Sequence, residues 1–438
     1  MKIALGVGFY YPDSIGGTEK YIHDLAIYLL SQNIEVVVIA PSVKGNYSYL
    51  NEEVKGREYK VYRFEVPKEL THEEVTDKVI CRGYENFENL VDELRLTIFH
   101  LHTLSTTLNY RHLKIAKEKG IKTLFTAHIP GIICPKGNFI NYPNQVCNGK
   151  LTHSNCGYCY AQWRHENKLV AEVTGRLATS SFIASLLENK IPQFGIVKRN
   201  KNILHQLEQH TDYVIAVCQW LYDAFLINNI SPNHLKICRQ GVSINYLDNN
   251  ITSKKETSNI RIGCIGRLEP IKGLHILLNA YENIIKKNPQ LPLELHIVGV
   301  KQELYQDYYQ ELQHKIQTLP NITYQENLPS KKVSEFMIDV DFLCIPSTCL
   351  ETGPIVAYEA FANKTPIIGA NIGGVAELVE DGKTGFLYQF NNLSTFEEIL
   401  LKIATHPALV KELSKNITLP RTTQQVGEEM LTIYQSLK

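Results

Sequence analysis

The sequence predicts an α/β protein with two doubly wound domains, each built around a mainly parallel sheet. Short apolar runs alternate with amphipathic helical stretches, and this series occurs twice, before and after a polar segment. The runs are continuously apolar rather than alternating, which is typical of strands buried on both faces of a parallel sheet. Strands that alternate with helices indicate the doubly wound arrangement.

The first series predicts a domain over residues 1–243. Residues 129–165 lack a clear periodicity and hold four of the ten Cys, so we interpret them as an irregular insertion into this domain. The first amphipathic helix is expected at 18–30, and the strands are expected at 3–7, 34–40, 59–64, 96–101, 122–126 and 213–217.

Residues 244–260 are polar and rich in Asn, Ser and Thr, and we interpret them as the linker. The C-terminal residues 421–438 form a helical segment, amphipathic at 428–437, that can pack back on the first domain. The second domain is expected at 261–420, with a helix at 273–287 and strands at 260–265, 293–298, 322–325, 341–345 and 366–369. Two such domains imply a cleft, and ligands of open α/β sheets bind beyond the carboxyl ends of the strands.

Composition and charge exclude several classes of protein. The chain has 438 residues, 44% hydrophobic and 21% charged, which matches a soluble globular protein rather than a disordered, collagen-like or coiled-coil one. Lys plus Arg and Asp plus Glu both number 45, so net charge does not favour nucleic acid. No apolar run reaches the roughly 18 residues of a membrane span. The N-terminus lacks signal-peptide features, so we expect a cytoplasmic protein.

The first candidate ligand loop contains Gly16 and Gly17, which follow the first expected strand and precede a helix. Adjacent glycines let the backbone approach a ligand, and a helix N-terminus offers N–H groups to an anion. The alternative is a flexible strand-to-helix loop. The spacing is not a GxGxxG fingerprint, which disfavours a nicotinamide cofactor.

A second loop combines two cations with a helix start. Arg267 follows the strand expected at 260–265, and Lys272 lies just before the next helix. Two cations and helix N–H groups together suit a diphosphate. The alternative is a pair of surface cations that flank a helix.

A third loop follows the strand expected at 341–345 and carries Glu351, Gly353 and Pro354, with Glu359 about two turns into the next helix. The two carboxylates can line one groove, and Pro354 suits a first helical turn. Paired carboxylates also fit a hydrolase that uses an acid and a base. The remaining alternative is one capping Glu and one solvated Glu.

Taken in order and spacing, these loops resemble the retaining glycosyltransferases of the glycogen-synthase-like group, family 4. The resemblance covers nearly the whole chain and is weakest over 42–95 and 129–205. The matching stretches are Gly16-Gly17, Gly266-Arg267-Leu268-x3-Lys272-Gly273, Glu351-x7-Glu359, Asn371-Ile372-Gly373-Gly374-x2-Glu377 and Asp381-Gly382-x2-Gly385-Phe386-Leu387.

The resemblance implies a GT-B fold, with two Rossmann-like domains that face each other across a cleft. It implies that Arg267 and Lys272 hold the donor diphosphate and stabilise the leaving group. Glu351 and the backbone at Gly353 and Pro354 would hold the donor sugar, and Glu359 the ribose hydroxyls. Gly16 and Gly17 would approach the diphosphate from the first domain. The hydrolase interpretation is displaced, because it gives the two cations no role.

Histidines end two of the expected strands. His128 follows the strand expected at 122–126, and the family often has a His near the reacting sugar at this position. His100 and His102 end the strand expected at 96–101. A histidine at a strand end is more often structural, so the resemblance favours a catalytic role for His128 over His102.

The sequence departs from the family pattern at two places. Residues 240–243 read Gln-Gly-Val-Ser, where the family usually has Asn-Gly-Val-Asp, and Gly353-Pro354 replaces the common Phe-Gly. The second form is a familiar variant. These departures leave open which nucleotide-sugar donor the protein prefers.

Cys134, Cys147, Cys156 and Cys159 have the form C-x12-C-x8-C-x2-C within the insertion. Thiolates paired by a C-x2-C turn suit tetrahedral zinc. The region has few large aliphatic side chains and needs some tie to be ordered. A structural zinc is the leading interpretation, and the alternatives are disulfide pairing and ordinary free thiols.

A short basic run, Lys198-Arg199-Asn200-Lys201, lies near an apolar helical stretch at 177–187. A solvated charge run is one interpretation. The other is peripheral contact with an anionic membrane, which would fit a lipid-linked acceptor at the inner face of that membrane.

The resemblance implies a retaining hexosyltransferase that uses a UDP- or GDP-sugar and a glycan or lipid-linked acceptor. Polysaccharide, glycolipid or other glycoconjugate biosynthesis would be its setting. No cofactor is expected for catalysis, because Arg267 and Lys272 supply the cations. The alternatives are a non-catalytic nucleotide-sugar-binding protein and an epimerase or phosphorylase on the same fold. The intact Arg267, Lys272, Glu351 and Glu359 argue against a mere binding protein.

Overall fold

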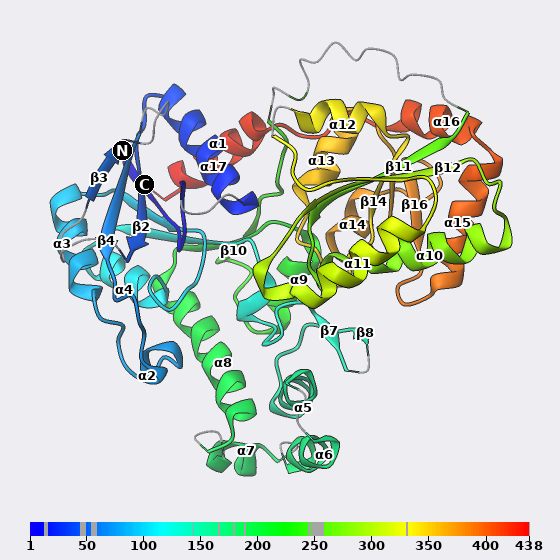
Figure 1. Cartoon of the computed structure of the whole chain (residues 1–438). Coiled ribbons are helices and arrows are strands. Elements are labelled where there is room, and N and C mark those ends of the chain that lie inside the picture. Colours follow the sequence, from blue (N-terminus) through cyan, green and yellow to red (C-terminus); the bar gives the residue numbers. More distant parts are fainter. Residues whose placement is uncertain are drawn as a thin grey trace. The chain divides into compact units, whose positions relative to one another are not determined.

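The computed structural model describes residues 1–12, 16–43, 50–53, 59–142, 144–164, 167–177, 180–187, 190–243, 246, 258–329 and 332–437. They form two compact units, one of Met1–Gln240 with Thr423–Lys438 and one of Gly241–Thr422. Each unit is a parallel sheet with helices on its faces (Figure 1). The α/β prediction is therefore confirmed. Most of the linker expected at 244–260 lies outside the described residues.

The sheet of the first unit has the order β10-β9-β6-β5-β1-β2-β4-β3. The edge strand β3 pairs antiparallel with β4, and the other neighbours pair in parallel. The strands are β1 (Lys2–Gly6), β2 (Glu35–Ser42), β3 (Leu50–Glu53), β4 (Lys60–Glu65), β5 (Ile98–Leu101), β6 (Lys122–Ala127), β9 (Tyr213–Ala216) and β10 (Leu235–Ile237).

The helices of the first unit cover this sheet and extend beyond it. They are α1 (Gly17–Ser31), α2 (His72–Val75), α3 (Tyr84–Leu94), α4 (Tyr110–Glu118), α5 (His153–Trp163), α6 (Lys168–Leu177), α7 (Ser181–Leu187), α8 (Pro192–His210), α9 (Gln219–Ile227) and α17 (Thr423–Gln435). The expected first helix and the expected strands thus form within about two residues of their predicted positions.

The insertion is less irregular than its composition suggests. It contains a 3-10 turn, η1 (Pro130–Ile132), a short hairpin of β7 (Ile140–Asn141) and β8 (Gln145–Val146), and the helix α5. The expectation of irregular structure was wrong over α5. The Thr152 hydroxyl caps this helix by accepting a hydrogen bond from the Asn155 N–H at 3.3 Å.

The C-terminal helix α17 completes the core of the first unit. Val426, Met430 and Tyr434 are buried among residues of β1 and α1. Gly427 lies against the Tyr28 ring of α1, where a Cβ would overlap the ring. The Tyr434 hydroxyl is 2.6 Å from His100 Nδ1 in the central strand β5. The helix begins at Thr423, five residues earlier than its amphipathic pattern indicated.

The sheet of the second unit has the order β13-β12-β11-β14-β15-β16, with neighbours in parallel. Its strands are β11 (Ile260–Arg267), β12 (Leu293–Val300), β13 (Ile322–Gln325), β14 (Phe342–Ile345), β15 (Ile367–Ala370) and β16 (Gly385–Tyr388). Its helices are α10 (Leu274–Lys287), α11 (Gln306–Thr318), α12 (Val333–Asp339), α13 (Ile355–Ala362), α14 (Gly373–Leu378), α15 (Leu393–Thr405) and α16 (Ala408–Asn416), with 3-10 turns η3 (Pro270–Lys272) and η4 (Glu303–Tyr305).

A buried ion pair joins the two central strands of this sheet. Arg261 in β11 binds Asp341, the residue before β14, through Nε at 3.1 Å and through a second nitrogen at 3.1 Å. A two-pronged Arg–carboxylate contact fixes geometry as well as charge. The pair therefore sets the register between the strands whose carboxyl ends carry the Arg267 and Glu351 loops.

Among the described residues, no helix combines the length and apolarity that a bilayer crossing requires.

Candidate active site

Three predicted loops meet at the carboxyl edge of the second sheet. They follow β11, β14 and β15, which are neighbours in the sheet. The Thr348 N–H donates to the Ile271 carbonyl at 2.8 Å, and the Gly374 N–H donates to the Glu351 carbonyl at 2.6 Å. The structure thus brings together the motif stretches at Arg267–Gly273, Glu351–Glu359 and Gly373–Gly374, which are far apart in the sequence.

Two glycines allow this close approach. Gly273 has φ +73°, and a Cβ there would overlap the Pro346 carbonyl oxygen. Gly373 has φ +57°, and a Cβ there would lie 2.8 Å from Leu350 Cα. Only glycine adopts a positive φ readily and also fits where there is no room for a Cβ. The glycines of the motifs therefore serve to pack the Glu351 loop between its two neighbours.

Lys272 and Glu351 form the central contact of the site. Lys272 Nζ lies 2.7 Å from Glu351 Oε1, and the Ser347 hydroxyl donates to the same oxygen at 2.7 Å. Burial works to lower the pKa of Lys272, but the Glu351 carboxylate outweighs it and raises that pKa. Lys272 is therefore a fixed cation. The sequence did not indicate Ser347, because an isolated serine in a loop carries no signal.

Arg267 ends β11 and presents its guanidinium to solvent. Its side chain is 58% exposed and pairs with Glu269 at 2.8 Å. An exposed guanidinium keeps donors available for a phosphate, for which its planar fork is well suited. Arg267 and Lys272 thus provide one accessible and one anchored cation on the same loop.

The start of α13 holds the remaining residues predicted in this unit. Gly353 has φ +104°, and Pro354 is the residue just before the helix. Glu359 lies in the second turn and is buried. The first N–H groups of a helix have no partner within it, so this end suits an electron-rich ligand.

Gly16, Gly17 and His128 belong to the first unit. Gly16 is the residue before α1, and a Cβ there would lie 2.7 Å from Glu19 Oε2. The Gly16 carbonyl accepts the Lys20 N–H at 3.1 Å, as in a regular first helical turn. The predicted strand-to-helix position of the glycine pair is therefore observed.

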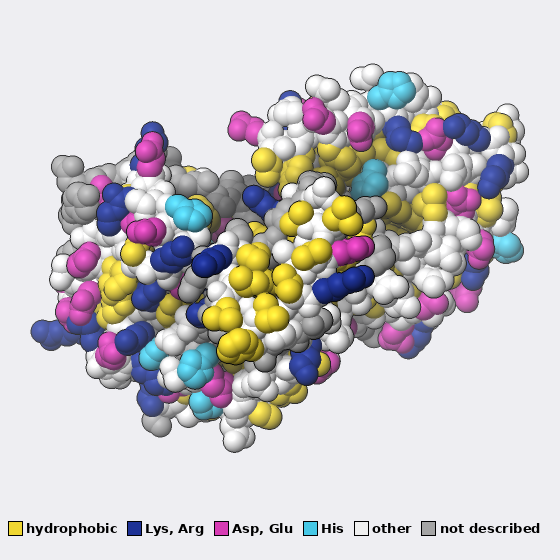
Figure 2. Space-filling model, turned by 90° about the horizontal axis from the view of Figure 1, so that it is seen from below, with side chains coloured by type: hydrophobic (Ala, Val, Ile, Leu, Met, Phe, Trp, Pro, Cys, Tyr) yellow, Lys and Arg dark blue, Asp and Glu magenta, His cyan; other side chains and the backbone are white. Residues whose placement is uncertain are grey.

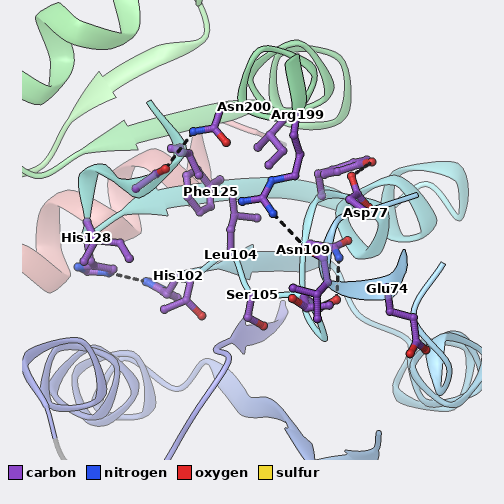
Figure 3. A pocket seen from close by; sticks show the side chains of 18 residues that line it. Glu74, Asp77, His102, Leu104, Ser105, Asn109, Phe125, His128, Arg199 and Asn200 are labelled. Carbon is purple, nitrogen blue, oxygen red and sulfur yellow. Dashed lines mark hydrogen bonds between the residues drawn. The ribbon is translucent and has the colours of Figure 1, made fainter. Parts of the chain in front are cut away.

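His128 and His102 form a buried pair where β6 and β5 end. Their rings are stacked, with His102 Nδ1 3.1 Å from His128 Nε2 (Figure 3). The Tyr21 ring of α1 meets His128 edge-on at 4.8 Å. The His100 ring lies 4.0 Å from the His102 ring, and its two nitrogens contact the Thr126 and Tyr434 hydroxyls. Its role is thus structural, whereas His102 and His128 border a cavity.

Burial makes this pair sensitive to acid. It lowers the pKa of His128 to about 3. Between that value and the usual 6.5 the unfolded chain binds a proton that the folded chain excludes, so stability falls as pH falls. For His128 alone, we expect the free energy of unfolding to be lower by about 2 kcal/mol at pH 5 than at pH 7.5. Urea unfolding of His128→Gln should show a smaller loss of unfolding free energy between these pH values. A loss equal to that of wild type would contradict a lowered pKa for His128. His314→Gln, at an exposed position, is the control.

The cavity beside these histidines has a volume of about 280 Å³ and lies within the first unit. Figure 3 shows His102, His128, Arg199 and Asn200 around it. Arg199 donates to the Val75 carbonyl at 3.2 Å, and Asn200 to the Gly131 carbonyl at 3.2 Å. His102 Nε2 is buried and has no partner among the described residues. The sequence marked residues 198–201 only as a charge run, and their place in a cavity wall is set by the tertiary structure.

The four insertion cysteines line another cavity of the first unit, of about 380 Å³. All four are free thiols of intermediate exposure. In the described part of the chain, no three His, Cys, Asp or Glu side chains are arranged to hold a metal ion. The structure therefore gathers Cys134, Cys147, Cys156 and Cys159 around one space without a closed ligand set.

Two family descriptions match successive parts of the chain. Residues 15–246 match Glycosyltransferase Family 4, and residues 248–419 match Glycosyl transferases group 1. Among curated relatives, the D-inositol 3-phosphate glycosyltransferase of Rhodococcus erythropolis is 28% identical over 162 residues, 36% of this chain and 36% of that protein. An uncharacterized 41.2 kDa protein in the cps region of Klebsiella pneumoniae is 26% identical over 200 residues, 44% of this chain and 52% of that protein. The chain thus matches about a third to a half of the length of these relatives.

Solved structures match over the whole chain. HepE of Anabaena, crystallised with UDP and glucose, has a TM-score of 0.64 at 16% identity and covers 100% of both chains. Sucrose-phosphate synthase of Thermosynechococcus elongatus has a TM-score of 0.68 at 16% identity, over 100% of this chain and 98% of that one. These likenesses confirm the GT-B fold. With both halves matched by the family descriptions, the chain belongs to glycosyltransferase family 4, the group 1 glycosyl transferases.

Proposed function

We propose that this protein transfers a hexose from a nucleoside-diphosphate sugar to an acceptor hydroxyl, with retention of anomeric configuration. The observation that carries the proposal is the Lys272–Glu351–Ser347 contact beside Arg267, at the carboxyl edge of a parallel sheet. Cations suit the diphosphate, and carboxylates suit sugar hydroxyls. HepE, which shares the fold, is solved with UDP-glucose, so a UDP-sugar is the first donor to test, followed by GDP-sugars.

In the proposed reaction the donor diphosphate contacts Arg267 and Lys272. The bond between the anomeric carbon and the phosphate oxygen breaks, and a bond to the acceptor oxygen forms on the same face of the sugar. The departing phosphate takes the acceptor proton. Cations placed where negative charge develops stabilise such a transition state without a metal ion. Glu351 and the backbone at Gly353 orient the sugar, and Glu359 accepts hydrogen bonds from the ribose.

For the acceptor we propose a glycan or a lipid-linked glycan that enters the His102–His128 cavity. The cavity wall offers His128 and Asn200 as hydrogen-bonding groups and the Arg199 guanidinium as a cation. Polysaccharide or glycolipid biosynthesis at the cytoplasmic face of the membrane is the setting that fits this acceptor class.

A panel of nucleotide-sugars tests the proposal. Thermal shift identifies the donor that stabilises the protein, and a labelled sample of that donor then reports transfer and slow hydrolysis. Release of the nucleoside diphosphate supports a transferase. A donor that binds but is neither hydrolysed nor transferred to glycan or lipid extracts would favour the alternative, a non-catalytic nucleotide-sugar-binding protein.

A further inference from the structure

The helices α6 and α7 expose apolar side chains on the outside of the molecule. In α6 the exposed residues are Leu169, Val170, Val173 and Leu177, a spacing that forms one helical stripe. The opposite side of α6 packs inward, because a Cβ at Gly175 would lie 3.0 Å from the Tyr158 ring of α5. The apolar stripe of α6 thus faces solvent, whereas a surface helix usually buries its apolar stripe.

The neighbouring helix α7 also exposes apolar side chains. In α7, Phe182 is 73% exposed and Leu186, one turn later, is 61% exposed. Trp163 at the end of α5 is also exposed. Viewed from below, hydrophobic side chains gather into a patch on the face to which α5–α7 belong (Figure 2). Contiguous apolar patches on a soluble protein mark interaction sites.

The charges of the segment that contains this surface are mostly positive. Residues 160–201 contain seven Lys or Arg and three Glu, in a chain whose net charge is zero. Arg164, Arg176, Lys190, Lys198 and Lys201 are exposed, whereas Glu172 is the exposed acidic residue among the described part of this stretch. Apolar helices bordered by basic side chains complement an anionic lipid surface, where acyl chains and headgroups meet.

The position of these helices also suits a bilayer. Figure 1 shows α6 and α7 at the end of α8 that lies away from the sheet of the first unit. A protruding apolar tip can enter a planar interface, whereas a protein helix or peptide is usually received by a groove. We propose that the α6–α7 surface, with Trp163, docks the protein on an anionic membrane.

Vesicle sedimentation tests this docking in the full chain without donor or acceptor, so its outcome is independent of the proposed reaction. Binding is expected to vesicles of phosphatidylcholine with 30% phosphatidylglycerol and to weaken at high salt, because salt screens the basic rim. Leu169→Glu with Phe182→Glu should weaken binding at least tenfold. Leu304→Glu, at an 83% exposed leucine of the second unit, is the matched control and should bind as wild type.

Three results would overturn the proposal. One is no binding to the anionic vesicles, and another is equal binding by wild type and by the Leu169 and Phe182 variant. The third is a wild-type dimer, seen by sedimentation velocity, that the same variant dissociates, since the surface would then be an interface between two copies. Circular dichroism and a thermal melt check that the variants fold.

A second inference rests on a different observation, the sulfur environment in the insertion. Cys147 Sγ accepts the Gly149 N–H at 3.5 Å, and Cys156 Sγ accepts the Thr152 N–H at 3.4 Å. Backbone N–H groups aimed at sulfur stabilise a metal-bound thiolate. Cys156 and Cys159 are three residues apart in α5 and so share one side of that helix.

We infer that Cys134, Cys147, Cys156 and Cys159 take one structural zinc ion in the cavity that they line. Binding would require the four sulfurs to move to about 2.3 Å from one ion, since the described side chains do not form a closed ligand set. The bound ion would tie η1, the β7–β8 hairpin and α5 together. This segment has few large aliphatic side chains of its own to hold it.

Metal analysis of the protein, purified without chelator, decides this inference. One zinc per chain is expected, falling to less than a tenth in Cys156→Ser with Cys159→Ser. Cys81→Ser, at a buried cysteine outside the cavity, is the matched control and should keep the metal. Substoichiometric metal with four titratable thiols, or disulfides among the four by mass spectrometry, would overturn the inference.

Discussion

Lys272→Ala is expected to lower turnover of the donor at least a hundredfold. Loss of one group that stabilises developing charge costs about 2.7 kcal/mol or more in the transition state. Lys272 is anchored 2.7 Å from Glu351, so its ammonium is already placed when the phosphate departs. Arg267→Ala should have a similar effect through the other side of the diphosphate. The measurement is the rate of nucleoside diphosphate release from the donor that the panel identifies.

The controls separate catalysis from folding. Lys272→Ala leaves the part-buried Glu351 without its cation, so a thermal melt must show that the second unit stays folded. Lys272→Arg keeps the charge and should retain more activity than Lys272→Ala. Lys383→Ala, at an exposed lysine of the same unit, should be as active as wild type. Near-normal turnover of folded Arg267→Ala and Lys272→Ala proteins would remove the diphosphate assignment.

Glu359→Ala should weaken binding of the nucleoside diphosphate by about a hundredfold. A carboxylate that accepts two ribose hydroxyls makes hydrogen bonds to a charged group, each worth about 1.5 kcal/mol. Glu359 is buried in the second turn of α13, so the helix holds its carboxylate in place. Calorimetry with the nucleoside diphosphate alone measures this effect without any acceptor.

The comparison variants keep this prediction testable if Glu359→Ala is unstable. Glu359→Gln preserves the shape and one acceptor oxygen, so we expect an intermediate affinity. Glu398→Ala, at an exposed glutamate of α15, should bind as wild type. Unchanged affinity in a folded Glu359→Gln or Glu359→Ala protein would mean that the ribose contact lies elsewhere.

Local patterns in the sequence determined much of the fold. Buried parallel strands are continuously apolar, so β1, β2, β11 and β12 could be located from short runs. Local signals also placed Glu351 and Gly353 on the loop after a strand, because such a loop is defined by the few residues that flank it. Arg267 was expected just after a strand that ends at 265, and the structure makes it the last residue of β11. The short strand β10 was not anticipated, since three residues contain too little periodicity.

Contacts between distant residues were decided only by the tertiary structure. Lys272 and Glu351 are 79 residues apart, and His100 and Tyr434 are 334 residues apart. Periodicity tells which face of an element is buried but not which partner covers that face. The sequence therefore could not show that α17 completes the core of the first unit. The outward stripe of α6 has the same explanation. Its apolar spacing predicts a helix with one apolar face. That this face is exposed, while Gly175 packs against Tyr158, is seen only in the tertiary structure.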